Sequence, residues 1–529
     1  MRIALRGLIG ASLIAVAMAE AARASSPAWD AWAGLPIVRV EITSREIFDV
    51  QAAESNLFYG WANALHVRTH ASVIERELLF AEGEPFDPLR VAESARNLRR
   101  IGIFQDVVVD VARQGVGVAV HIVTDDRWST RLVTDISNQG DILQVRLGLE
   151  DINFIGRAFQ LGGSVVTSSD VDAVDFSMSD PRVFGTRWRA GFRYAADDLA
   201  ILNEARLERP YYSEFVHVTT ELDYRSVRGE RRLFGSGSVT LDTLDVDETF
   251  GEAFVAVHGH AATRSRLGLL LSRRELSRDV HHEQTALALV WGWMRRDYHR
   301  QRNIDRYDSI EDVGTGWTLQ FGAGADLEAL GGWRNRPFWR ADGAWARFLG
   351  GSTLIGVAAR HHGFGRNRRI ENGRLVAETW GFWRQGDPAV LAWSVGWVAL
   401  FREPEYLQTT LGGDARLRGY AARHDVGTRA LFMSLEERVF SNWNILFLRL
   451  GGTLFVDAAQ AWEPGEPPRW KAFDVGAGFG LRIGNRKSGA GISRLDFAFG
   501  RNNFEISLSG GSFFRAARGM EYLNASLYR

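Results

Sequence analysis

The sequence predicts a mainly β protein, a 16-stranded antiparallel transmembrane β-barrel preceded by one small α/β domain. Three observations lead to this prediction. From residue 131 onward, alternating segments of about ten residues recur between Gly, Asn, Asp and Arg, as in barrel strands. Before residue 127, helical and strand periods occur together. The composition combines 55 Gly, 18 Trp and 31 Phe with 24% charged residues, which suits an apolar outside and a polar lumen.

The chain begins with residues typical of an export signal. Arg2 and Arg6 precede an apolar run at residues 8–18, and small residues around 17–24 offer cleavage sites. The run is shorter than the ~20 residues that a spanning helix needs. We therefore predict a signal peptide at residues 1–24 rather than a membrane anchor.

Two features of the composition exclude other classes of protein. The chain contains no Cys, which excludes disulfides, thiolate metal sites and cysteine nucleophiles. Its formal net charge of −1 provides no basic surface, so we expect no nucleic-acid partner.

Residues 37–126 predict the small α/β domain. Ser72 and Glu75 have the spacing of a capping box, which marks a helix start, and Gly115 and Gly117 bracket a hairpin turn. In chain order we expect a strand around 38–42, a helix over 72–80 that ends at Gly83, a helix after Pro88, and strands around 107–111 and 116–122.

Residues 131–514 predict the barrel, with about 24 residues for each of sixteen strands and its share of loops. Five consecutive segments from residue 430 to 509 keep one face almost free of charge, whereas the other face collects Glu, Asp, Arg and Gly. Glu437 is the exception, near a strand end. A cation on the lipid face costs ~2–4 kcal/mol at mid-bilayer, so we expect the apolar face to contact lipid. A soluble β-sandwich is the alternative, but it needs no second, polar face.

The polar face offers a docking site. One strand lines this face with glycines, which let another backbone or a planar side chain approach closely. Neighbouring strands add carboxylates on the same side. If the long segment from about residue 402 to 428 folds into the lumen, Arg418 can place its planar fork on those carboxylates. The alternative is a solvated surface loop. The docking residues are Gly476, Gly478, Gly480, Glu436, Asp457 and Asp474.

These segments resemble the outer-membrane barrel superfamily that includes BamA, TamA and the two-partner-secretion transporters. The family's V/L-R-G-F/Y loop tip, E-x-R strand, F-x-D-x-G strand and G-x-G-x-G-x-R strand have counterparts in order along this chain. Residues 37–126 resemble a POTRA domain, above all from Glu93 to Phe104. The counterparts are Leu417-Arg418-Gly419-Tyr420, Glu436 to Arg438, Phe455 to Ala459 with Asp457 at its centre, and Gly476 to Arg482, followed by Arg494-Leu495-Asp496.

The chain also departs from this pattern. Ala459 stands where the family usually has Gly, and only one POTRA-like domain is evident. The chain ends in Tyr528-Arg529 rather than in an aromatic barrel terminus. We therefore expect the last barrel strand over Asn503 to Phe514, with Phe513 or Phe514 as its aromatic end, and a tail over residues 515–529. A strand formed by the tail is the alternative.

The resemblance implies a mechanism and a place in the cell. The Arg418 loop is expected inside the barrel, held by Asp457 and Glu436, with Arg438 and Phe455 beside them. The first strand, near Leu143 to Asp151, is expected to pair weakly with the last, so that client strands can add at this seam. The barrel is expected in the bacterial outer membrane with the POTRA domain in the periplasm. Expected partners are the lipid bilayer, unfolded outer-membrane or secreted clients, and periplasmic accessory proteins.

The resulting prediction is a factor that inserts β-barrel clients into the outer membrane or passes polypeptide across it. Export of one dedicated partner is the alternative within this class, although no plug helix is evident before residue 37. A passive channel shares the barrel but needs neither the POTRA domain nor a docked loop. No catalytic motif is evident, so we expect no enzyme, catalytic residue, cofactor or metal. The histidine pairs at 281–282 and 361–362 are expected to be solvated.

Overall fold

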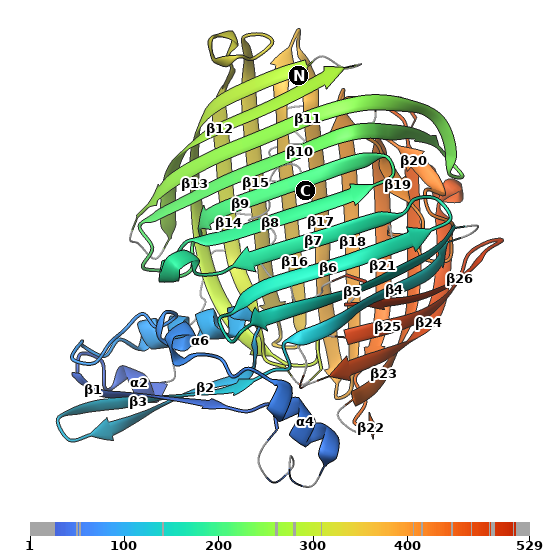
Figure 1. Cartoon of the computed structure of the whole chain (residues 1–529). Coiled ribbons are helices and arrows are strands. Elements are labelled where there is room, and N and C mark those ends of the chain that lie inside the picture. The colour runs from blue at the N-terminus through green and yellow to red at the C-terminus, as the bar shows by residue number, and fades with distance from the viewer. Residues whose placement is uncertain are drawn as a thin grey trace.

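The computed structural model describes residues 27–514. Gaps in the description fall at residues 49–50, 52–53, 55, 140–141, 260–262, 279–281, 308, 406, 414–415, 446–447, 467, 486, 488–491 and 512. The expected signal peptide and the expected tail at 515–529 lie outside the described residues. The chain forms a closed β-barrel with a small α/β domain against one end (Figure 1).

The small domain is a three-stranded sheet covered by helices. Its strand order is β1-β3-β2, with β1 parallel to β3 and β2 antiparallel to β3. The core between sheet and helices includes Val91, Leu98, Val118, Val120 and Ile122, each at most 1% exposed. The elements are α2 (Pro27–Asp30), β1 (Ile37–Arg45), α4 (Leu57–Leu65), α5 (Ala71–Glu75), α6 (Pro88–Ile101), β2 (Phe104–Gln114) and β3 (Gly117–Asp126).

The expected helix after Pro88 is α6, and both of its ends are capped. The Asp87 side chain accepts a hydrogen bond from the backbone N–H of Leu89, and Gly102 ends α6 with a φ of 83°, as a left-handed C-cap requires. The expected helix over 72–80 is wrong in extent. It is only α5, His70 is its N-cap, and no side chain caps it. The helix α4 was missed because its sequence is apolar almost throughout, so polar and apolar residues do not alternate with the period of a helix.

The barrel has 20 strands in the described part of the chain, not sixteen. Each strand is antiparallel to its neighbours, and β26 closes the barrel on β4. The strands are β4 (Thr130–Gln139), β5 (Ile142–Phe154), β6 (Phe159–Ser168), β7 (Ala173–Asp180), β8 (Arg189–Asp197), β9 (Ala200–Arg209), β10 (Val218–Gly235), β11 (Val239–His258), β12 (Arg264–Arg278), β13 (His282–Gln301), β14 (Glu311–Asp326), β15 (Arg336–Leu349), β16 (Thr353–Arg366), β17 (Arg369–Gly386), β18 (Ala389–Phe401), β21 (Arg429–Val439), β23 (Leu448–Trp462), β24 (Asp474–Asn485), β25 (Ile492–Phe499) and β26 (Phe504–Gly510).

The strand number was underestimated because the connections are short. Two residues separate β16 from β17 and again β17 from β18, so the average allotment is about 19 residues rather than about 24. The small sheet of β19 (Thr409–Leu411) and β20 (Asp425–Gly427) and the two-residue β22 (Asn444–Ile445) lie in the connections around β21.

Side chains alternate between a buried and an exposed face along the C-terminal strands, as expected. In β21, Phe432, Glu436 and Arg438 are buried, whereas Leu435 is 46% exposed. The same holds in β23 and β24, where Leu454 is 64% and Phe479 is 50% exposed. The charged face therefore points into the barrel and the apolar face points outward.

The closure between the last and first strands is short. Among the described residues, the ladder between β26 and β4 registers only Ser507 with Ser137 and Leu508 with Ile136. The next ladder, between β4 and β5, runs from Thr130 opposite Asp151 to Gln139 opposite Ile142. The first strand is thus β4, and the expected first strand near 143–151 is instead β5. The last strand ends at Gly510, earlier than expected.

The small domain is fastened to the barrel end by polar contacts. Arg99 on α6 forms an ion pair of 2.6 Å with Asp312 at the start of β14. Arg182, in the connection between β7 and β8, pairs with Glu77 of the domain. The Trp128 backbone N–H donates to the Lys487 carbonyl over 2.7 Å. No helix in the residues that the structure describes has the length and apolar character needed to cross a membrane.

Candidate functional site

The segment between β18 and β21 turns back into the barrel lumen. Its start and end pair as β19 and β20, so that the intervening residues form a closed loop. Gly412, Gly413 and Gly419 adopt φ values of 116°, 59° and 84°, which glycine tolerates and other residues rarely adopt. At the tip of this loop, Leu417 and Arg418 are both 0% exposed. The loop is therefore docked in the lumen rather than solvated.

The Arg418 guanidinium binds carboxylates from three strands. Nε and Nη2 donate to the two oxygens of Asp457 over 2.7 and 2.9 Å, which is a bidentate pair. Nη1 donates to Glu436 over 2.8 Å and to Asp496 over 3.4 Å. The structure thus brings together Arg418 and two of the three expected carboxylates, Glu436 and Asp457. Asp496 on β25 is an additional partner.

Two aromatic rings enclose the Arg418 guanidinium. Its Cζ atom lies 3.6 Å from the ring centroid of Phe455 and 3.9 Å from that of Phe513. A cation over an aromatic face is attracted by the ring quadrupole, and more strongly where water is excluded. Phe513 follows the last strand, so the expected aromatic end is wrong: the described residues after Gly510 reach the lumen instead of lipid.

Glycines make room for this arrangement. A Cβ atom on Gly476 would lie 2.0 Å from the Arg418 carbonyl oxygen, so this glycine admits the loop backbone directly. A Cβ on Gly478 would lie 2.5 Å from the Phe455 ring. A Cβ on Gly480 would lie 2.0 Å from an Asp496 carboxylate oxygen. Gly476 therefore makes direct loop contact, whereas Gly478 and Gly480 admit the groups that hold Arg418.

The rest of the loop tip is also fixed. The Gly419 backbone N–H donates to the Glu505 carboxylate over 2.8 Å, and the Tyr420 hydroxyl donates to the Val475 carbonyl over 3.0 Å. Leu417 packs in an apolar cluster with Tyr420 and other buried residues. Asp474, which was also expected at the docking site, instead contacts the His424 ring at 2.9 Å.

The network continues toward the end of the barrel that carries the small domain. Arg438 donates to Glu436 over 2.8 Å and to Asp305, in the connection between β13 and β14, over 2.6 Å. Its Nη2 donates to the Phe514 carbonyl over 2.8 Å. Side chains of alternating charge therefore run from the docked Arg418 loop to the β13–β14 connection, at the end of the lumen that carries the small domain.

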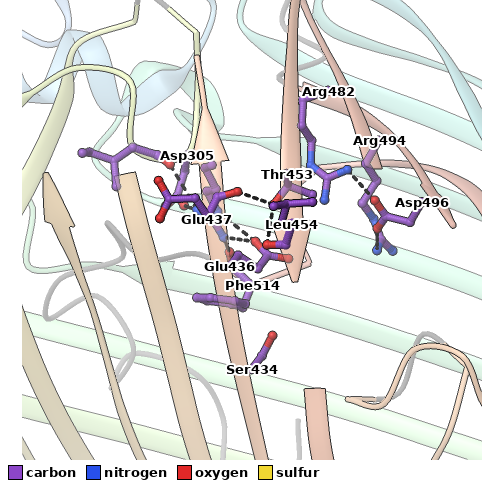
Figure 2. Close-up of polar contacts among 12 residues, drawn as sticks. Asp305, Ser434, Glu436, Glu437, Thr453, Leu454, Arg482, Arg494, Asp496 and Phe514 are labelled. Atoms are coloured by element: carbon purple, nitrogen blue, oxygen red, sulfur yellow. Dashed lines mark hydrogen bonds and ion pairs between the residues drawn. The ribbon is translucent and has the colours of Figure 1, made fainter. Parts of the chain in front are cut away.

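Figure 2 shows the two further arginines of this network, Arg482 and Arg494, directed toward Asp496. Sequence reasoning missed Asp305, which comes from a distant connection, and assigned Phe513 to the aromatic end of the last strand instead of to this site. Gly451 and Gly484 could have indicated that the β13–β14 connection packs inside the barrel. A Cβ atom on either glycine would clash with the ring or hydroxyl of Tyr307, which lies in that connection. Those glycines indicate a docked aromatic residue without naming it.

This arrangement of paired arginines and carboxylates binds and positions the docked loop. Within the described ranges, no group of three or more His, Asp or Glu side chains is placed to hold a metal ion. His362 is buried, so the expectation of solvation is wrong for this residue. His281 lies outside the described residues.

Comparisons with known proteins agree with this architecture in part. Residues 66–127 match the POTRA family model, described as a surface antigen variable number repeat, which confirms the expected domain type. No curated protein sequence matches the chain.

Three solved structures are similar at low identity. BamA from Haemophilus ducreyi lacking POTRA domains 1–3 is 13% identical with a TM-score of 0.38, over 90% of this chain and 85% of that chain. CdiB from Acinetobacter baumannii is 12% identical with a TM-score of 0.41, over 90% and 74%. CdiB from Escherichia coli is 11% identical with a TM-score of 0.43, over 89% and 76%.

Proposed function

We propose that this protein is an outer-membrane barrel that inserts β-barrel clients into the membrane or passes polypeptide across it. The observation that carries the proposal is the combination of a docked Arg418 loop with a closure registered at two positions. A rigid structural barrel needs no short closure, and an open pore needs no lumen loop held by buried ion pairs.

The outward face supports a place in a bilayer. Leu454 on β23, Phe479 on β24 and Ile506 on β26 are 64, 50 and 42% exposed. Soluble monomers rarely expose contiguous apolar patches of more than a few hundred Å². With charge concentrated on the lumen side of the C-terminal strands, the pattern is that of a transmembrane barrel. The POTRA domain then lies on the periplasmic side.

The short closure supports the mechanism. When β26 and β4 separate, each exposes unpaired backbone N–H and C=O groups, which invite another strand to pair. A client strand can add to either edge and exchange out as the seam closes. In the POTRA domain β1 and β2 are the two edges of the sheet, so they are the candidates for capturing an extended client first.

A seam disulfide tests this mechanism. The chain has no Cys, so the double variant Ser137→Cys/Ser507→Cys introduces the only thiols, at residues that pair across the seam. We expect oxidation to abolish client assembly or export and reduction to restore it. The matched control is Leu481→Cys/Leu495→Cys, which joins β24 to β25 away from the seam. Full activity of the oxidised seam variant excludes lateral opening.

The two client types are distinguished in the cell. Deleting the gene and comparing the outer-membrane and secreted proteomes by quantitative mass spectrometry shows which proteins depend on it. Loss of barrel proteins from the membrane supports insertion, whereas loss of one secreted protein supports dedicated export. If neither fraction changes, the proposal fails, and the conductance of the purified barrel then tests the passive-channel alternative.

A further inference from the structure

The helix α4 presents an apolar face to solvent. Its sequence, LFYGWANAL, contains no charged residue. Leu57 is 66% exposed and Trp61 is 57% exposed. Ala64 is exposed as well, and positions i, i+4 and i+7 share one side of a helix. These three residues form an apolar stripe, the α4 stripe, whereas α5 and α6 bury most of their large apolar residues.

The opposite side of α4 is fastened to the domain, so the direction of the stripe is fixed. The Tyr59 ring stacks on the Phe48 ring, with centroids 4.1 Å apart and planes inclined by 5°. The Asn63 side chain donates to the Phe48 carbonyl over 2.8 Å and accepts from the Phe48 N–H over 3.1 Å. Tyr59 and Asn63 are four residues apart and lie about half a turn from the α4 stripe.

Contacts of a barrel turn place α4 at the barrel rim. Lys487, in the turn between β24 and β25, donates through Nζ to the Ile47 carbonyl over 2.6 Å. The same Nζ lies 5.3 Å from the centroid of the Phe48 ring, against which α4 packs. In Figure 1, α4 and β22 lie at the same end of the barrel.

The rim beside this turn is itself apolar on the outside. Asn485, two residues before Lys487, pairs with Leu448, which in turn pairs with Ile445. Ile445 is 57% exposed, and Trp443, two residues before it, is 75% exposed. The outward apolar face of the barrel thus extends through Trp443 and Ile445 to the rim near α4.

We propose that the α4 stripe lies in the membrane interface, in the leaflet nearest the POTRA domain, and anchors that domain to the bilayer next to the seam. This inference rests on the proposed membrane location of the barrel. A lipid surface is the occupant favoured by the continuity of apolar surface from the barrel wall to the rim. Tryptophan is enriched at this depth, and apolar helix faces bind there in the plane of the membrane.

A client strand fits this surface less well. The backbone groups of a helix are paired within it, so α4 offers no edge for strand addition. The turn that holds α4 joins β24 and β25, and β25 is followed by β26 at the seam. The interfacial helix therefore holds the POTRA domain close to the place where client strands are proposed to enter.

Single thiols in the otherwise cysteine-free full-length chain test this directly. Three variants carry an environment-sensitive fluorophore and are reconstituted into phosphatidylcholine vesicles with and without bromine on the acyl chains. Trp61→Cys reports on the α4 stripe, Phe479→Cys on the outward barrel face, and Gln114→Cys on the exposed tip of the β2–β3 hairpin. All three positions are exposed, so the labels do not disturb the core.

We expect brominated lipid to quench the label at position 61 to an extent similar to that at 479, and to leave the label at 114 unquenched. If the label at 479 is quenched while that at 61 behaves like that at 114, the interfacial helix is wrong and the membrane barrel stands. Protection of position 61 from aqueous iodide without quenching by lipid also overturns it, since a protein then covers the stripe. An unquenched label at 479 refutes the membrane location itself.

Discussion

Replacing Arg418 with alanine removes a cation that binds carboxylates from three strands inside the lumen. Glu436 keeps Arg438 as a partner, and Asp496 keeps Arg482 and Arg494. Asp457 keeps the Ser434 hydroxyl, at 2.6 Å, and the backbone N–H of residue 418, at 3.3 Å, but loses both of its bonds to the guanidinium. Breaking a buried ion pair costs ~3–5 kcal/mol, and the remaining partners place the cost at the lower end of that range.

A cost of about 3 kcal/mol changes the docking equilibrium of the loop roughly 100-fold, since ~1.4 kcal/mol is a factor of ten. The strands themselves lose no ladder hydrogen bond. We therefore expect the Arg418→Ala barrel to fold, with heat-modifiable migration on gels, but with its loop released and client assembly or export lost. Limited proteolysis with mass spectrometry should then find new cuts within residues 416–424.

The matched control is Arg416→Ala in the same loop. Arg416 stacks over the Phe432 ring at 4.8 Å and is partly exposed, a contact worth about 0.5–1 kcal/mol. Arg416→Ala removes the same charge but loses much less docking free energy, so the loop in this variant should stay protected from protease. The reasoning is refuted if Arg418→Ala remains protected and active like the parent protein.

Three further outcomes are expected. Gly476→Ala should release the loop as Arg418→Ala does, because the new Cβ atom would clash with the Arg418 carbonyl oxygen. A loop that stays protected from protease in this variant would contradict the docking geometry. The control is Gly452→Ala, whose Cβ would have no contact closer than 3.7 Å. Reversing one charge of the Arg99–Asp312 pair should loosen the POTRA domain, seen as a broader spin-label distance distribution to the barrel, and reversing both should restore it. Burial, opposed by Arg96, raises the pKa of the Glu93 carboxyl. This carboxyl therefore stabilises the fold most at a pH below its unfolded pKa, and that contribution is lost as the pH rises through its folded pKa. Glu93→Gln should then raise the melting temperature at neutral pH and lose that advantage in acid.

The alternation of side chains predicted which residues face the lumen. Successive side chains of a strand point to opposite faces, and charged side chains are costly on a face that contacts lipid. In β21 it separates Glu436 and Arg438 from Leu435, as the structure does. The spacing of carboxylates and glycines likewise predicted where Arg418 docks. These inferences depend on neighbouring strands and on local pattern alone.

Features that depend on closure of the whole barrel could not be read in this way. Asp305 meets Arg438 from 133 positions away, and no local pattern specifies that contact. The predicted number of strands was wrong because connections of two residues hardly interrupt the alternation of polar and apolar side chains. Phe513 was misassigned because an aromatic residue after a last strand suits lipid as well as a cation in the lumen, and only the tertiary structure decides between them.

The barrel wall has unequal height around its circumference. The strand β13 has 20 residues and β26 has 7. At ~3.3 Å per residue, these lengths are about 66 Å and about 23 Å before tilt, and tilt of the strands shortens the latter further. A bilayer's hydrocarbon core is about 30 Å thick. In the membrane location proposed above, hydrophobic mismatch around the closing strand favours thinned and less ordered lipid, which would ease the entry of a new strand at the place where the wall is shortest.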